Sequence, residues 1–200
     1  TGGGLCIESF SKLRLSHSII RNCRAFLGGA IYMSFGSSPK ILQSKLLSNS
    51  ASNSGGGMFM AMNSNAIVSE CIISGNVSQV GGGILMHQCS PVIQQSIIDR
   101  NRGSSSAGGI YINTNSNPVL SNSTLFGNSA GQTGGGILVG YESDPVLTNC
   151  ILWGNTAPAN GGLFADASSN PQITYSNIQG GHVGIGNINA LETGLTLHRL

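Results

Sequence analysis

Charged residues are scarce in this sequence of 200 residues, at 8% of the chain, against about 25% in a typical globular domain. Proline is rare too, with 6 residues, while glycine reaches 30 residues and apolar residues make up 40%. Intrinsic disorder requires low hydrophobicity and high net charge, so this composition excludes a largely disordered chain. A formal net charge of +2 also gives no support for a nucleic-acid partner, because such proteins carry a strongly basic surface.

Long apolar runs and known signals are missing as well. No stretch of the sequence approaches the roughly 18 apolar residues of a transmembrane helix, so we expect no transmembrane segment. The chain opens with TGGGL rather than with a charged and then apolar leader. Because this opening already belongs to the repeat described below, we expect a fragment of a longer protein. The 5 cysteines match no zinc or redox motif, and we expect no metal site.

The few basic residues are distributed unevenly. Six of them lie in the first quarter of the chain, opposed there by Glu8 alone: Lys12, Arg14, Arg21, Arg24, Lys40 and Lys45. Runs of charge usually form solvated surface, so the simplest interpretation is a basic, hydrated end of the molecule. The alternative is contact with an anionic polymer or lipid.

A glycine-rich phrase recurs seven times at intervals of 26 or 27 residues, as GGGLCI, GGAIYM, GGGMFM, GGGILM, AGGIYI, GGGILV and NGGLFA. No helical period of 3.6 residues is present, and short runs of alternating β-branched and small residues predict strands. Leucine-rich repeats would need a helical half, and propeller blades need about 40 residues per unit. The sequence therefore predicts an all-β fold, a single parallel β-helix of about seven coils with 26–27 residues each, over residues 1–189.

In such a coil, equivalent residues of successive repeats lie about 4.8 Å apart, so each column of the repeat becomes a ladder. One column contains asparagine in five consecutive coils, at Asn49, Asn76, Asn101, Asn128 and Asn155. Buried asparagine must be hydrogen-bonded, and stacked amides can bond to one another. Cys71 and Cys150 occupy an inward column otherwise held by serine, which predicts small core residues. Cys6, Cys23 and Cys89 fall in other columns, so we expect no disulfides.

The phrase GGAI followed by LxxN or IxxN resembles the paired repeat of chlamydial polymorphic outer-membrane proteins. More widely, it is similar to right-handed parallel β-helix proteins of the pectin-lyase-like superfamily. The segments NCILWGNTA and NPQITYSNIQGG resemble the final coils of bacterial secreted β-helix proteins with a C-terminal surface anchor. The resemblance implies a right-handed parallel β-helix protein that is secreted by a bacterium or lies on its surface. After Asn189 the pattern is lost, and residues 190–200 are predicted to form an atypical tail.

An outward column of sheet-forming residues is apolar in every coil. It consists of Cys6, Tyr32, Phe59, Leu85, Tyr111, Leu138 and Phe164, which we name the apolar stripe. Exposed apolar surface of this extent usually marks a contact. A flanking loop or a neighbouring chain is the simpler interpretation, and a ligand platform is the alternative. We also expect self-association, end to end through unpaired strand edges or along the stripe.

A second outward column is predicted to bind carbohydrate. Asp99, Phe126 and Trp153 lie on successive coils, with Arg100 beside Asp99. Sugar rings stack on aromatic faces, and carboxylate and guanidinium groups bond to their hydroxyls. The leading functional hypothesis is thus a structural or adhesive module that binds extracellular polysaccharide. Aromatic side chains that merely pack on the surface are the alternative.

An enzyme that acts on polysaccharide is the competing class: a lyase, glycoside hydrolase or carbohydrate esterase. Its weak catalytic candidates are Asp99, Asp144, Asp166 and His87. Paired carboxylates at suitable spacing are hard to find, because only Glu142 and Asp144 are close in the frame and they share a turn. An Asx turn in the SDP segment would explain Asp144. No cofactor is expected, except calcium under the lyase alternative.

Overall fold

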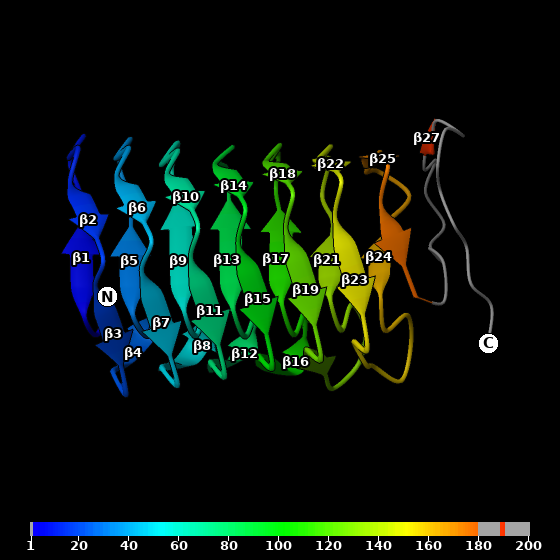
Figure 1. Cartoon of the computed structure of the whole chain (residues 1–200), viewed down its shortest axis with the longest axis horizontal. Coiled ribbons are helices and arrows are strands. Elements are labelled where there is room, and N and C mark those ends of the chain that lie inside the picture. Colours follow the sequence, from blue (N-terminus) through cyan, green and yellow to red (C-terminus); the bar gives the residue numbers. More distant parts are fainter. Residues whose placement is uncertain (1, 180–188, 191–200) are drawn as a thin grey trace.

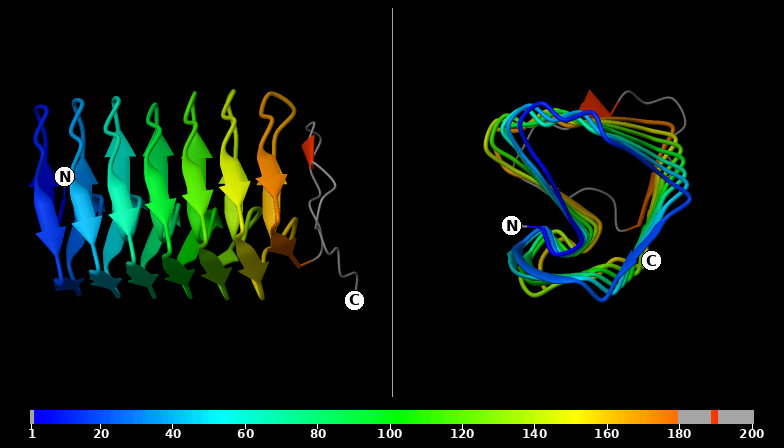
Figure 2. Two further views of the ribbon diagram at one scale, coloured as in Figure 1. Left: turned by 45° about the horizontal axis from the view of Figure 1, so that its top comes forward. Right: turned by 90° about the vertical axis from the view of Figure 1, so that its left-hand side faces the viewer.

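The computed structural model describes residues 2–179, 189 and 190. The chain winds into successive coils that stack along one axis, and each coil contributes one short strand to each of up to four parallel sheets (Figure 1). The described residues contain strands, turns and bends but no helix. The end-on view in Figure 2 shows the coils superimposed, with an indentation on one side of the cross-section.

Sheet A has seven strands, β1 (Leu5–Ile7), β5 (Ile31–Met33), β9 (Met58–Ala61), β13 (Ile84–His87), β17 (Ile110–Asn113), β21 (Ile137–Val139) and β24 (Leu163–Ala165). Sheet B has eight, β2 (Arg14–Ser16), β6 (Lys40–Leu42), β10 (Ile67–Ser69), β14 (Val92–Gln94), β18 (Val119–Ser121), β22 (Val146–Thr148), β25 (Gln172–Thr174) and β27 (Asn189–Ala190). Sheet C has seven, β3 (Ile19–Arg21), β7 (Lys45–Leu47), β11 (Ile72–Ser74), β15 (Ile97–Asp99), β19 (Thr124–Phe126), β23 (Ile151–Trp153) and β26 (Asn177–Ile178). Sheet D has five, β4 (Arg24–Leu27), β8 (Ser50–Ser54), β12 (Val77–Val80), β16 (Arg102–Ser106) and β20 (Ser129–Ala130).

The pairing register is the one that the repeat predicts. Ile84 pairs with Met58 on one side and with Ile110 on the other, and all three side chains are fully buried. The inward residues of sheets A, B and C form one continuous apolar core along the axis. The all-β fold, the parallel pairing and the count of about seven coils are therefore confirmed.

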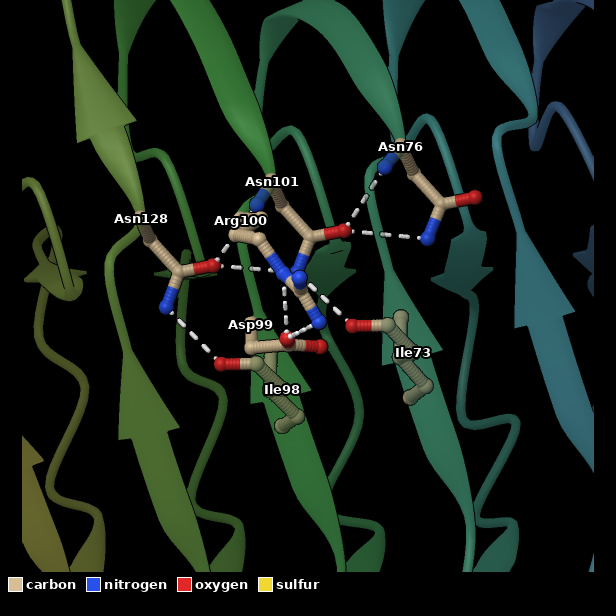
Figure 3. A network of polar contacts seen from close by, with 7 residues as sticks. All are labelled: Ile73, Asn76, Ile98, Asp99, Arg100, Asn101 and Asn128. Atoms are coloured by element: carbon tan, nitrogen blue, oxygen red, sulfur yellow. Dashed lines mark hydrogen bonds and ion pairs between the residues drawn. The ribbon is translucent and has the colours of Figure 1, made fainter.

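The asparagine column forms a hydrogen-bonded ladder inside the coils (Figure 3). The side-chain amide of Asn101 donates to Oδ1 of Asn128 at 3.0 Å and to the carbonyl of Ile73 at 2.9 Å. Its own Oδ1 accepts from the backbone and side-chain nitrogens of Asn76, at 2.9 and 3.0 Å. The prediction of a buried ladder is confirmed for four members. It is wrong for Asn155, which is only half-buried although its bonds to Asn128 are present.

Serine columns also form hydrogen-bonded ladders between coils, with hydroxyl oxygens as the acceptors. The backbone nitrogen of Ser96 donates to Oγ of Ser123, and that of Cys71 donates to Oγ of Ser96. The prediction of small core residues at Cys71 and Cys150 is confirmed, since both are 1% exposed. All 5 cysteines are free, as predicted.

Glycines occur where successive coils come into close contact. A Cβ atom on Gly108 would lie 2.5 Å from the carbonyl oxygen of Gly135 and 2.5 Å from the backbone of Ser129. Gly56 and Gly82 occupy the same column, and each meets the backbone of the following coil at similarly short range. This column therefore has no room for a side chain. The predicted tail lies outside the described residues, apart from the backbone of Ala190.

Candidate functional site

The apolar stripe lies on the outward face of sheet A. Its register is as predicted, and the rings of Tyr32 and Phe59 stack with centroids 5.5 Å apart and planes 4° apart. Leu85 and Leu138 are nevertheless only 5% and 8% exposed, so the expectation of outward exposure is wrong for these two. The other members are half-buried, except for Cys6, which is exposed.

The turn that leads from sheet D into sheet A lies close to the stripe. Gly81 and Gly134 have positive φ, and the chain there folds back onto the stripe. A Cβ atom on Gly81 would lie 3.1 Å from Cβ of Leu85, and one on Gly134 would lie 2.7 Å from Cβ of Leu138. Much of the stripe is thus covered by the turn of its own coil. The stripe offers less free surface than its composition suggests.

The predicted carbohydrate-binding column lies at the carboxyl ends of the strands of sheet C. Asp99 pairs with Phe126, and Phe126 with Trp153, so three successive coils contribute one side chain each. Phe126 is 48% exposed and Trp153 is half-buried. A Cβ atom on Gly154 would lie 3.3 Å from the Phe126 ring, which therefore rests on the backbone of the following coil. The two aromatic side chains form one track along the solenoid axis.

Asp99 and Arg100 form an ion pair beside this track (Figure 3). Nε and one terminal nitrogen of Arg100 lie 2.7 and 2.6 Å from Oδ2 of Asp99. The guanidinium side chain is 73% exposed, whereas Asp99 is only 6% exposed. Oδ1 of Asp99 is buried and accepts no hydrogen bond from the described residues. Asp99 therefore holds Arg100 in place, and Arg100 presents the remaining N–H donors to solvent.

Asp166 and Asp144, two further catalytic candidates, form hydrogen bonds that stabilise the turns. Oδ2 of Asp166 accepts from the backbone nitrogen of Tyr141 at 2.8 Å, and Oδ1 accepts from Ser168. Burial raises the pKa of Asp166, but these hydrogen bonds outweigh it and lower the pKa below its ordinary value. Oδ1 of Asp144 accepts from the backbone nitrogen of Asn170 in the next coil at 2.7 Å. This contact between coils, rather than the expected Asx turn, accounts for Asp144.

His87 lies at the end of β13, between Ala61 and Asn113 of the adjacent coils, as the repeat predicts. Neither neighbour is an acid that could orient its imidazole ring. Within residues 2–179, no group of three or more His, Cys, Asp or Glu side chains could hold a metal ion. In the same part of the chain, no helix is long and apolar enough to cross a membrane.

The turns from sheet A to sheet B carry large exposed side chains, three aromatic residues and one methionine, that the repeat did not predict. Phe10, Phe35, Met62 and Tyr141 are 77%, 51%, 46% and 62% exposed, and all four have positive φ. A hollow of about 280 Å³ is lined by Phe10, Phe35, Gly36, Met62 and Asn63. A second hollow of about 270 Å³ is lined by Thr114, Asn115, Tyr141, Glu142 and Ser168. The signal in the sequence was a large side chain one or two residues before a repeating serine.

A comparison with protein families agrees with this architecture. A family model described as a right-handed beta helix region matches residues 1–106 and 95–190, which together span almost the whole chain. A search of curated proteins finds no match. The match agrees with the parallel register, the short strands and the internal polar ladders described above. The chain belongs to the family of right-handed β-helix proteins.

Proposed function

We propose that this chain is a structural or adhesive module of a secreted or cell-surface bacterial protein, and that it binds extracellular polysaccharide. The narrower kinship with pectin-lyase-like and polymorphic outer-membrane proteins is part of the same proposal. The binding surface is the track formed by Arg100, Phe126 and Trp153. A solenoid is suited to this role because equivalent positions of its coils form an extended surface.

The observation that carries the proposal is the placement of two accessible aromatic side chains on adjacent coils, next to a fixed guanidinium. Phe126 and Trp153 are paired in register, so their positions lie about 4.8 Å apart along the axis. Aromatic faces contact the apolar faces of sugar rings, while charged groups hydrogen-bond to the hydroxyl groups. Arg100 can supply the hydrogen bonds to sugar hydroxyls, because its ion pair with Asp99 leaves other N–H donors free and the side chain largely exposed.

Asp99 has a supporting role in this site. A guanidinium that is already oriented loses less side-chain entropy on binding a ligand than a free one. The 2.6–2.7 Å contacts to Oδ2 of Asp99 supply this orientation. Asp99 is therefore a positioning residue and does not itself contact the sugar.

The arrangement of the carboxylates favours binding over catalysis. A general acid needs a pKa raised toward the working pH, whereas hydrogen bonds lower the pKa of Asp166 despite its partial burial. Asp99 is committed to Arg100, and Asp144 to the backbone of the next coil. All three carboxylates thus stabilise the coils in this conformation.

The test pairs a glycan array with an activity screen. We expect binding to one or a few polysaccharides and no turnover of pectin, alginate or acetylated glycans, with or without calcium. Binding should weaken in Arg100→Gln and remain in Arg102→Gln, an exposed arginine on the same coil. Turnover that disappears in Asp99→Asn, Asp144→Asn or Asp166→Asn would instead identify a polysaccharide-active enzyme. An array without any binder would refute the proposal.

A further inference from the structure

Apolar and basic side chains lie together at one corner of the first three coils. Phe10, Leu13, Phe35 and Met62 are 77%, 39%, 51% and 46% exposed, and we name them the apolar corner. They belong to the turns between sheets A and B, at the upper edge of the coils in Figure 1. The carbohydrate track lies at the opposite edge, where the strands of sheet C end. The two surfaces are therefore separate.

The turns that carry these side chains are fixed by hydrogen bonds between coils. The backbone nitrogen of Phe10 donates to the carbonyl of Phe35 at 2.9 Å, and that of Gly36 donates to the carbonyl of Met62 at 2.8 Å. A Cβ atom on Gly36 would lie 2.6 Å from the ring of Phe10, so the ring packs on the bare backbone of the next turn. The apolar side chains are held outward on three adjacent coils.

Basic residues flank the apolar corner without acidic partners. Lys12, Arg14 and Lys40 are exposed, and Arg14 and Lys40 are register partners in β2 and β6. None of the three forms an ion pair with the described residues. Lys12 and Arg14 follow Phe10 by two and four residues, and Lys40 follows Phe35 by five. Positive charge therefore adjoins the apolar side chains.

The same corner changes character in the later coils. Coil six carries Tyr141 and Glu142 in the equivalent turn, followed by Asp144, and Asp166 lies in coil seven. An apolar and basic surface thus occupies only the first coils. An anionic bilayer fits it, because apolar side chains enter the interfacial region while lysine and arginine attract the anionic headgroups.

We propose that the apolar corner, together with Lys12, Arg14 and Lys40, binds the surface of an anionic lipid bilayer. A sugar-binding site would need directional polar groups around its rings, yet Asn63 is the one polar side chain lining this hollow. Flexible basic side chains beside apolar ones suit a diffuse layer of phosphates better. This surface acts independently of the carbohydrate track.

The test is co-sedimentation with phosphatidylcholine vesicles, with and without added phosphatidylglycerol. We expect binding only to the anionic vesicles and its loss at about 1 M salt, where the Debye length is about 3 Å. The combined substitution Lys12→Gln, Arg14→Gln and Lys40→Gln should weaken binding on the order of 100-fold, at about fivefold per basic residue. The pair Phe10→Ser and Phe35→Ser should weaken it at least about tenfold.

Tyr141→Ser is the matched control for the aromatic residues, because Tyr141 is exposed in the same column of turns. Arg102→Gln is the control for charge. Both should bind vesicles like the unaltered chain, and circular dichroism should show that every variant is folded. The glycan test above uses a different surface, so either proposal can fail alone.

Several results would overturn the bilayer proposal. One is absence of binding to anionic vesicles. Another is vesicle binding that is abolished by a soluble acidic polysaccharide but unchanged by Phe10→Ser with Phe35→Ser. That pattern would identify a site for polyanions in general. A third is a dimer, seen by light scattering, that dissociates in the Phe10→Ser and Phe35→Ser variant while no vesicle binding occurs. That result would identify the apolar corner as an interface between copies of this chain.

Discussion

The side-chain amide of Asn101 donates to Oδ1 of Asn128 at 3.0 Å, and the backbone nitrogen of Asn101 donates to the same oxygen at 3.0 Å. The side-chain oxygens of four asparagines each accept from two donors of the preceding coil: Asn76, Asn101, Asn128 and Asn155. Because Asn101 is fully buried, water cannot replace these contacts. The ladder fixes the vertical register of neighbouring coils.

Asn101→Leu should therefore destabilise the protein strongly. The backbone and side-chain N–H groups of Asn76 would lose their acceptor while buried. Each buried unsatisfied group costs about 1–3 kcal/mol, so we expect a loss of at least about 3 kcal/mol and a melting temperature about 10 °C lower. Thermal unfolding followed by circular dichroism measures this.

Asn155→Leu provides the graded comparison. Asn155 is half-buried and lies at the end of the ladder among the described residues, so water can partly satisfy the groups that it leaves. Its effect should be smaller than that of Asn101→Leu. An unchanged melting temperature in Asn101→Leu would contradict the role of the ladder.

The repeat made the fold predictable because every coil obeys the same local constraints. The columns that contain Ile84 and Asn101 recur in each coil, so their register and their inward direction could be derived from spacing alone. One column was missed although its spacing is of the same kind. Cys89 follows Ser64 by 25 residues and precedes Ser116 by 27, and the same two spacings flank Asn101 in the asparagine column. The structure places Cys89 in a serine ladder, where its backbone nitrogen donates to Oγ of Ser116.

The candidate sites were less predictable, because they depend on how side chains and turns cover one another. The outward direction of Leu85 followed from strand alternation, but its burial did not. The turn before it, with positive φ at Gly81, recurs at Gly55, yet Phe59 is only half-buried. The position of Asp99 followed from the register, but its burial and its ion pair with Arg100 did not. Side-chain cover thus differs between coils that share one backbone pattern, so spacing alone does not reveal it.

Gly108→Ala should reveal the close approach of successive coils. The new Cβ atom would lie 2.5 Å from backbone atoms of both Gly135 and Ser129. Relieving such a clash requires the coils to separate, and we expect a loss of about 3 kcal/mol in the free energy of unfolding. Urea denaturation provides the measurement.

Gly75→Ala separates this packing effect from backbone strain. Gly75 has a φ of +64°, but the nearest atom to its added Cβ is Oγ of Ser48 at 3.6 Å. The left-handed backbone should cost about 1–2 kcal/mol, partly offset by the smaller entropy of the unfolded chain. We expect a net loss of about 1 kcal/mol. Because Gly108 does not have positive φ, a loss at Gly108 no larger than the loss at Gly75 would contradict contact between coils as the reason for this glycine.

Asp166 should make stability depend on pH in the acid range. Its folded pKa lies below its ordinary value because hydrogen bonds from Tyr141 and Ser168 outweigh the effect of burial. The carboxylate therefore stabilises the fold above its unfolded pKa of about 3.9, and this contribution is lost as pH falls through the folded pKa. Asp166→Asn should destabilise at neutral pH and much less in strong acid.

Urea midpoints measured from neutral pH down to about pH 2 test this sign. Ser168→Ala should give a smaller loss over the same range, because it removes one of the hydrogen bonds to Asp166. A difference between Asp166→Asn and the unaltered chain that is constant with pH would contradict the argument.

Trp153 is the residue whose replacement should most affect carbohydrate binding. It supplies the largest flat surface of the track, and Phe126 extends this surface on the preceding coil. Trp153 is the only tryptophan of the chain. Titration with an oligosaccharide that binds should therefore shift the tryptophan fluorescence emission of the protein. Trp153→Ala should abolish binding measured by calorimetry, and Trp153→Phe should retain part of it because an aromatic face remains.

Tyr175→Ala is the matched control for this experiment. Tyr175 is an aromatic side chain that is 61% exposed and follows β25 of sheet B rather than β23 of sheet C. Its loss should leave both the affinity and the emission shift unchanged, because Tyr175 lies in a different column. Equal binding by Trp153→Ala and the unaltered chain would show that the aromatic side chains of the track pack on the surface without binding carbohydrate. Equal losses from the Trp153 and Tyr175 substitutions would instead indicate a contact that extends across both sheets, since a single column could not produce them.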